Sequence, residues 1–178
     1  MSRIFVGLAF VNALALAATF TVGFACEGRA AVSPDVPLTV VQQRFAVHLL
    51  AGLFTAVLTL VVHCMAFTYF MGTGRWVQEV VGAYGMPASL WDQARRYKQR
   101  ALPFVVGSIL LIIGTTSLGA ATDRGLIDGN VHLAAAVLAI GFNFWSFLRE
   151  YRAIRANGDL LETIMGEVGR MRRERGLQ

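Results

Sequence analysis

Charged residues are scarce in this chain. They make up 15% of its 178 residues, whereas hydrophobic residues make up 56%. Soluble domains carry about 25% charged residues. Four long segments contain no charged residue at all, namely those between Arg3 and Glu27, Arg44 and Arg75, Arg100 and Asp123, and Asp128 and Arg149. This distribution excludes a disordered chain and an ordinary soluble enzyme, and it leaves few ionisable groups for catalysis.

Cysteines are few, and soluble catalytic motifs are absent. The two cysteines, Cys26 and Cys64, differ so much in predicted depth that we expect no disulfide between them. The chain has no paired-cysteine motif and no phosphate-binding glycine pattern. The segment Gly72-Thr73-Gly74-Arg75 is interpreted as the end of a helix, because glycine commonly terminates helices. We therefore predict no catalytic residue.

Four apolar runs are long enough to cross a membrane. A helix needs about 20 apolar residues to span a bilayer core of roughly 30 Å, and helices satisfy their own backbone hydrogen bonds in lipid. The predicted spans cover residues 4–25, 45–71, 102–121 and 131–148. A cleaved signal peptide is the alternative for the first run, but its apolar stretch exceeds the usual core of about 7–15 residues. We predict an all-α, integral membrane four-helix bundle over residues 1–156.

The basic residues predict the orientation of this bundle. Thirteen of the sixteen Lys and Arg residues lie near the N-terminus, between the second and third spans, or after the fourth span. The other three are Arg29, Arg44 and Arg124. Because Lys and Arg mark the cytoplasmic side, we expect both termini in the cytoplasm of a bacterial inner membrane. Basic residues placed between apolar spans do not indicate a nucleic-acid partner.

Two amphipathic segments are expected along the cytoplasmic face. In residues 75–100, apolar residues recur at helical spacing, Gly85 breaks the helix, and Pro87 or Ser89 begins a second helix that continues into the third span. This pattern predicts an interfacial elbow. The segment Asn157-Gly158-Asp159 is predicted to end the fourth helix and to begin a separate amphipathic helix over residues 157–178, which packs on a partner, on lipid or on its own bundle.

Three histidines are the most informative polar residues, because ionisable side chains inside a membrane are costly and usually functional. His48 lies near the outer end of the second span and His132 at the outer start of the fourth. Both spans run inward, so the two imidazoles lie at similar depth. His63 lies fifteen residues beyond His48, about 22 Å deeper at the rise of a helix.

Two imidazoles from facing helices can bind one haem iron, and small residues near them would leave room for a flat macrocycle: Gly52 in the second span and Gly107 and Gly114 in the third. With four spans and His48 and His132 at matched depth, the sequence resembles the four-helix b-type cytochrome membrane subunits. These include the succinate dehydrogenase and fumarate reductase anchors and the cytochrome b561 group.

The resemblance implies one haem b near the outer face, with His48 and His132 as its axial ligands. It also implies a membrane subunit of a respiratory or photosynthetic electron-transfer complex, with other membrane subunits, the lipid bilayer and quinone as partners. The substrate-oxidising site would lie on another chain.

Other functions stay open. In a cofactor-free accessory subunit the histidines are structural, and His63 hydrogen-bonds to Asn12 or Asn143. A small transporter or copper-handling protein is indicated by soft or borderline ligands in the second span, which are His63, Cys64, Met65 and Met71. A proton path through His63 is disfavoured, because the four predicted spans contain no Asp or Glu.

Overall fold

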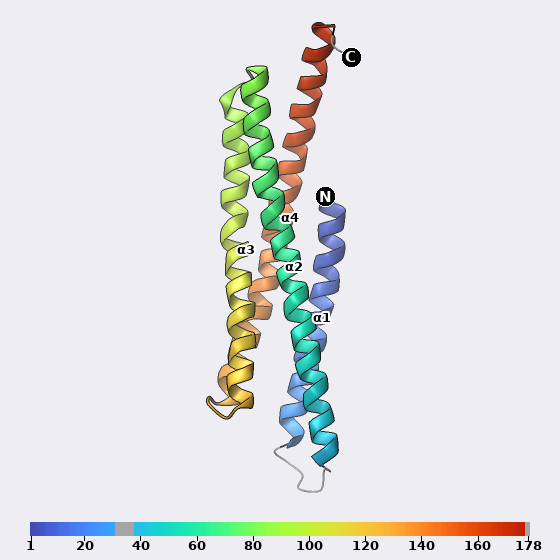
Figure 1. Ribbon diagram of the computed structural model, residues 1–178, viewed down its shortest axis with the longest axis vertical. Helices are drawn as coiled ribbons and strands as arrows, with labels where there is room; N and C mark the ends of the chain where they lie inside the picture. The colour runs from blue at the N-terminus through green and yellow to red at the C-terminus, as the bar shows by residue number, and fades with distance from the viewer. Residues whose placement is uncertain (31–37, 177–178) are drawn as a thin grey trace.

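In the computed structural model the chain forms four long α-helices (Figure 1), and residues 1–30 and 38–176 are described. The helices are α1 (Ser2–Ala30), α2 (Leu38–Tyr84), α3 (Ala88–Asp123) and α4 (Gly129–Glu174). The described residues contain no strand. The predicted all-α four-helix fold is confirmed.

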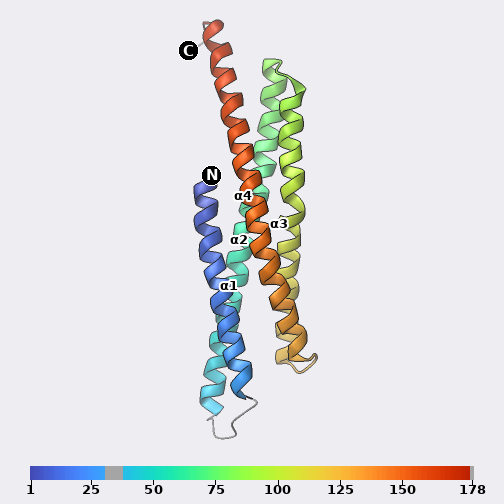
Figure 2. The same ribbon diagram turned by 180° about the vertical axis from the view of Figure 1, so that it is seen from behind.

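Each helix runs antiparallel to the one before it, and the views from the front and the back agree on this arrangement (Figures 1 and 2). α2 and α4 touch across the centre of the bundle, whereas no contact joins α1 to α3 within the described residues. α2 and α4 therefore carry the side chains that meet in the interior.

The outward faces of the bundle are apolar over a distance comparable to the thickness of a membrane. All four helices are long and apolar enough to cross a bilayer. Exposed large apolar side chains run from Ile4 to Phe24, from Phe45 to Trp76, from Val106 to Ile113 and from Val131 to Leu148. Water would make so large an apolar surface unfavourable, whereas lipid accommodates it. These are the features of an integral membrane protein.

The segment 75–100 differs from the predicted interfacial elbow. α2 continues without interruption through Gly72 and Gly74 to Tyr84, and α3 begins at Ala88. Gly85 makes the reversal with a φ of +63°, a conformation that only glycine adopts readily. The segment is therefore an antiparallel hairpin that prolongs the bundle (Figure 1).

The predicted helix break at residues 157–159 is not found either. α4 is continuous from Gly129 to Glu174. Asn157 is 1% exposed, and its side-chain amide donates to the Tyr69 hydroxyl and to Thr73 Oγ1 at 3.1 Å each. Because this residue is held by contacts with α2, the local tendency of Asn-Gly-Asp to end a helix is overridden.

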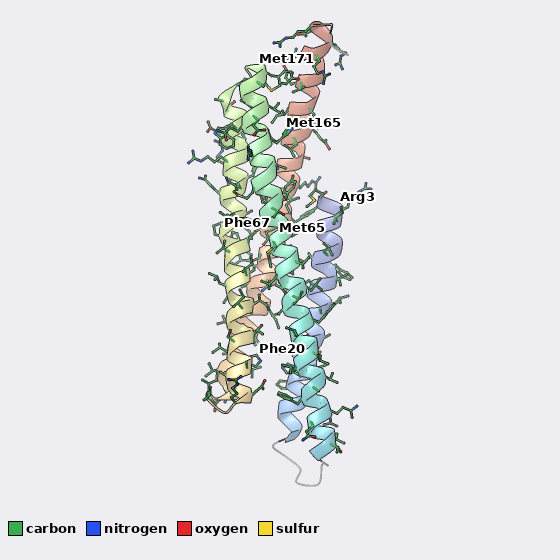
Figure 3. The ribbon with its side chains drawn as sticks, in the orientation of Figure 1. Arg3, Phe20, Met65, Phe67, Met165 and Met171 are labelled. Atoms are coloured by element: carbon green, nitrogen blue, oxygen red, sulfur yellow. The ribbon has the colours of Figure 1, made fainter. Side chains whose placement is uncertain are left out.

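Beyond the N-terminal turn of α1, the helices α2, α3 and α4 continue as a three-helix extension. Figure 3 shows Met165 and Met171 on this extension, past the level of Arg3 in α1. A separate apolar cluster holds it together, made of Val77, Val81, Met86, Ala94, Leu160 and Ile164. The apolar stripe of the C-terminal segment thus packs on its own bundle, one of the three alternatives that the sequence left open.

At the opposite end, a short turn joins α3 to α4. Gly125 has a φ of +68°, and the Asp128 carboxylate accepts a hydrogen bond of 2.7 Å from the backbone N–H of Asn130. Asp128 is therefore the N-cap of α4, a position that aspartate favours.

Candidate functional site

A cavity of about 500 Å³ opens at the end of the bundle that holds the α3–α4 turn, and all four helices line it. Binding cavities for small molecules and cofactors measure roughly 300–1,000 Å³. The wall is mainly apolar and includes Leu16, Phe20, Leu49, Ile112, Leu133 and Ile140. Its polar groups are few, which is typical of a site that takes a largely apolar ligand.

His48 from α2 and His132 from α4 both line this cavity. Their ring centroids lie 6.4 Å apart, and the ring planes make an angle of 71°. α2 and α4 are each antiparallel to α3, so they run in the same direction. Residues near the start of α2 and the start of α4 therefore lie at the same end of the bundle. The structure therefore brings together the two histidines that the sequence placed at matched depth.

Each imidazole sits against a glycine of a neighbouring helix. A Cβ built on Gly23 of α1 would lie 2.6 Å from His48 Cε1, and one built on Gly119 of α3 would lie 3.0 Å from His132 Cε1. Any larger residue at either position would displace the ring. Sequence analysis missed both glycines, because nothing local separates them from glycines that merely help helices to pack.

The three glycines that the sequence singled out lie differently. Gly52 lines the cavity, and a Cβ there would meet Thr19 at an ordinary 3.9 Å. The space beside Gly107 is filled by the Phe142 ring, 2.8 Å from a built Cβ. Gly114 faces open space and is not part of the cavity wall. Of these three, Gly52 is the one positioned to contact a ligand.

Several buried polar atoms of the cavity wall lack a hydrogen-bond partner among the described residues. They are His48 Nδ1, His132 Nδ1 and Thr122 Oγ1. A buried polar atom without a partner is costly, and its presence in a native structure calls for an unseen water, ion or ligand. The three residues line the cavity, and no described residue satisfies the hydrogen-bonding capacity of these atoms.

The spacing of the two imidazoles is compatible with one metal ion between them. Two imidazoles on opposite sides of one metal, each bonded at about 2 Å, hold their nitrogens about 4 Å apart. Their centroids then lie one ring radius further out on each side, close to the observed 6.4 Å. No group of three or more His, Cys, Asp and Glu side chains in the described ranges could hold a metal, so a metal ion between the two histidines would take its further ligands from outside the protein.

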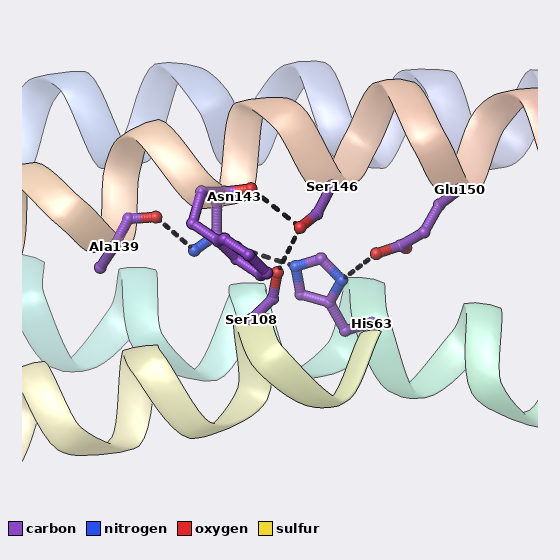
Figure 4. A network of polar contacts seen from close by, with 7 residues as sticks. His63, Ser108, Ala139, Asn143, Ser146 and Glu150 are labelled. Carbon is purple, nitrogen blue, oxygen red and sulfur yellow. Dashed lines mark hydrogen bonds and ion pairs between the residues drawn. The ribbon is translucent and has the colours of Figure 1, made fainter. Parts of the chain in front are cut away.

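The third histidine, His63, belongs to a different site in the centre of the bundle (Figure 4). Its Nδ1 lies 2.8 Å from Glu150 Oε1, and its Nε2 lies 2.8 Å from Asn143 Oδ1. His63, Glu150 and Asn143 are all fully buried, and Phe147 stacks on the imidazole with centroids 5.4 Å apart. The predicted Asn143 partner is confirmed, whereas Asn12 instead accepts from Thr59 Oγ1 at 3.1 Å.

Glu150 is the functional candidate that sequence analysis missed. It lies two residues beyond the predicted end of the fourth span, so the spans appeared to contain no acidic residue. α4 continues past that point and keeps Glu150 on the face that points at α2, two helical turns from Asn143. The reason given against a proton path through His63 is therefore wrong, because a carboxylate lies in direct contact with that histidine.

The soft ligands of the second span are dispersed. Cys64 is an exposed free cysteine and Met71 is 47% exposed, whereas Met65 packs against the apolar core. Adjacent residues of a helix point in different directions, which separates these side chains from His63. The side chain of Cys26 lies outside the described residues.

Further polar contacts continue along the interior faces of α2 and α4. Ser108 of α3 donates to Ser146 at 2.9 Å in the network around His63 (Figure 4). Towards the three-helix extension, Asn157 joins Tyr69 and Thr73. The bundle thus holds a cavity with two histidines near one end and a buried ionisable pair nearer the other.

Comparison with protein-family models, with curated proteins and with solved structures finds no match to this chain.

Proposed function

We propose that the chain is an electron-transfer subunit of a membrane complex and that it holds one b-type haem between His48 and His132. The observation that supports this is the pair of imidazoles 6.4 Å apart on the wall of an apolar cavity of about 500 Å³. A bound haem would supply one-electron transfer. Its potential would depend on its two axial imidazoles and on its burial.

The other residues of the cavity have roles that follow from their chemistry. Gly23 and Gly119 let each imidazole approach the neighbouring helix closely, which sets the positions of the two rings. Arg44 also lines the cavity, and a guanidinium is suited to the carboxylates of haem propionates. Asp123 is part of the same wall, and its carboxylate would repel propionates.

The proposed orientation puts the three-helix extension and both termini in the cytoplasm of a bacterial inner membrane. The support is the distribution of basic residues, since Arg149, Arg152 and Arg155 follow directly on the exposed apolar stretch that ends at Leu148. Lys and Arg concentrate on the cytoplasmic side. The haem would then lie near the outer face, and other membrane subunits and quinone would be its partners.

A reduced-minus-oxidised absorption spectrum of the purified protein tests the proposal. We expect a b-type band in the wild-type protein and in Leu133→Ala. This substitution enlarges the cavity and keeps both proposed iron ligands, His48 and His132. We expect loss of the band in His48→Ala and in His132→Ala. A wild-type protein without this band, purified with its complex intact, would support a cofactor-free accessory subunit instead. A band that persists in both histidine variants would refute the assigned ligands.

A further inference from the structure

The buried contact between His63 and Glu150 is independent of the cavity. Eleven residues of α4 separate Asn143 from His132, which is about 16 Å along the helix. Both members of the pair are fully buried. Glu150 Oε1 lies 2.8 Å from His63 Nδ1, and Glu150 Oε2 is buried without a hydrogen-bond partner among the described residues.

The hydrogen bonds around the pair determine how many protons it holds. The side-chain amide of Asn143 donates from Nδ2 to the carbonyl oxygen of Ala139 at 2.7 Å. A carbonyl oxygen can only accept, so Oδ1 is the atom that faces His63 Nε2, and that nitrogen must carry a hydrogen. One further proton then lies between Nδ1 and Glu150 Oε1, whichever of the two atoms holds it. The pair is therefore neutral overall, with one shared proton.

We infer that the His63–Glu150 pair is an exchangeable proton-binding site inside the membrane. At rest it holds the single shared proton. It takes up a second proton on Glu150 Oε2, which leaves His63 as an imidazolium beside a neutral carboxylic acid and changes the charge of the site from zero to +1. The proton comes from a hydronium ion on the side of the three-helix extension, which is left as water.

The surroundings favour a site that responds to protons. The titratable group in contact with Glu150 is His63, and the other side chains around the pair are neutral: Asn143, Ser146, Ser108 and Phe147. Of the other titratable groups, Tyr69, Tyr97 and Tyr151 pack partly buried against the same apolar core, whereas Arg3, Cys64, Arg149 and Arg152 are exposed. An intramembrane carboxylate paired with histidine is the kind of group that proton relays use.

Polar side chains lie between the pair and the extension. Asn157 stands seven residues beyond Glu150, about 10 Å along α4, and bonds to Tyr69 and Thr73. The Tyr69 hydroxyl also approaches the carbonyl oxygen of Ile154 at 3.5 Å. Exposed Arg149 and Arg152 flank Glu150 in the sequence, so the site lies close to the polar edge of the apolar band. We therefore expect protons to enter from this end.

Infrared difference spectroscopy of the purified protein between two pH values tests the inference, because a protonated carboxylic acid has its own carbonyl stretching band. We expect one such band that changes with pH, shifts in D2O and is absent in Glu150→Gln. The control Glu79→Gln, an exposed carboxylate, should leave that band unchanged. A Glu150 carboxyl signal that neither responds to pH nor exchanges with D2O would overturn the inference and leave a purely structural pair.

A second measurement covers the case in which Glu150→Gln does not fold. Wild-type protein labelled with ¹³C at the glutamate side-chain carboxyl should show the pH-dependent band at a lower frequency. In Glu150→Asp the band should persist but no longer respond to this label. A labelled wild-type protein whose pH-dependent bands are all unaffected by the label contradicts the assignment to glutamate. None of these readouts depends on haem.

Discussion

Substitution of Gly23 by alanine tests the geometry of the cavity most directly. The new Cβ would lie 2.6 Å from His48 Cε1 and 3.0 Å from His48 Nδ1, whereas carbon atoms in contact prefer about 3.5–4.0 Å. The overlap of about 1 Å must be relieved by moving the imidazole or α1. The ring is fixed at its own Cα on α2, so it can turn only into the cavity.

The expected magnitude follows from two opposing contributions. Overpacking of a close-packed interior costs about 1–3 kcal/mol, and alanine in place of glycine within a helix contributes about 1 kcal/mol in favour of folding. Gly52→Ala is the matched control, because it is also on the cavity wall and its Cβ would meet Thr19 at 3.9 Å. It receives the second contribution without the first. The two variants should therefore differ in free energy of unfolding by about 1–3 kcal/mol.

The assay is denaturation in detergent followed by far-UV circular dichroism, with haem content measured on the same samples. We expect Gly23→Ala to be less stable than Gly52→Ala and to retain less of the proposed haem than the wild-type protein, since the displaced imidazole no longer faces His132. Equal stability of the two variants would show that His48 does not pack on Gly23. If Gly23→Ala were less stable but kept the haem content of the wild-type protein, His48 would pack on Gly23 without being a haem ligand.

Four further predictions concern the helix contacts and the orientation of the bundle. In a double-mutant cycle, His63→Leu or Glu150→Leu alone should cost about 3–5 kcal/mol, because each leaves a buried ionisable partner, whereas the double variant should cost far less; additive losses in unfolding experiments would contradict a coupled pair. Asn157→Ala should lower the free energy of unfolding by about 1–3 kcal/mol through its lost buried hydrogen bonds. Gly158→Ala should be neutral or stabilising by up to about 1 kcal/mol, because α4 is continuous there and the new Cβ meets nothing within 4 Å; destabilisation by Gly158→Ala would argue for the helix break. A reporter fused after Gln178 should be active only in the cytoplasm, and activity on the outer side would reverse the proposed orientation.

Sequence patterns predicted the elements that depend on local chemistry. The absence of charge over four segments of about 20 residues leaves little choice but membrane helices. Gly85 is a turn signal that acts over a few residues, and in the structure it makes the reversal between α2 and α3. The helical rise alone placed His48 and His132 at one depth, and the structure has their rings 6.4 Å apart.

The same local signals misled where packing outweighs them. Gly72 and Gly74, and the segment from Asn157 to Asp159, look like helix ends in isolation. In the fold, α2 passes through the first and α4 through the second. Burial of Asn157 against Tyr69 and Thr73 is a long-range contact across 84 to 88 residues, which no local pattern contains.

By itself, the sequence determined that this protein is a bundle of membrane helices with two histidines at one depth, because hydrophobic length and helical rise are properties of single segments. Only the tertiary structure decided which glycines seat those histidines, that a cavity lies between them, and that Glu150 reaches His63. These depend on which faces of separate helices meet. Glu150 lies just past the end of an apolar run, so the sequence alone predicts an exposed charge. The packing of α2 against α4 places it in the interior, in contact with His63.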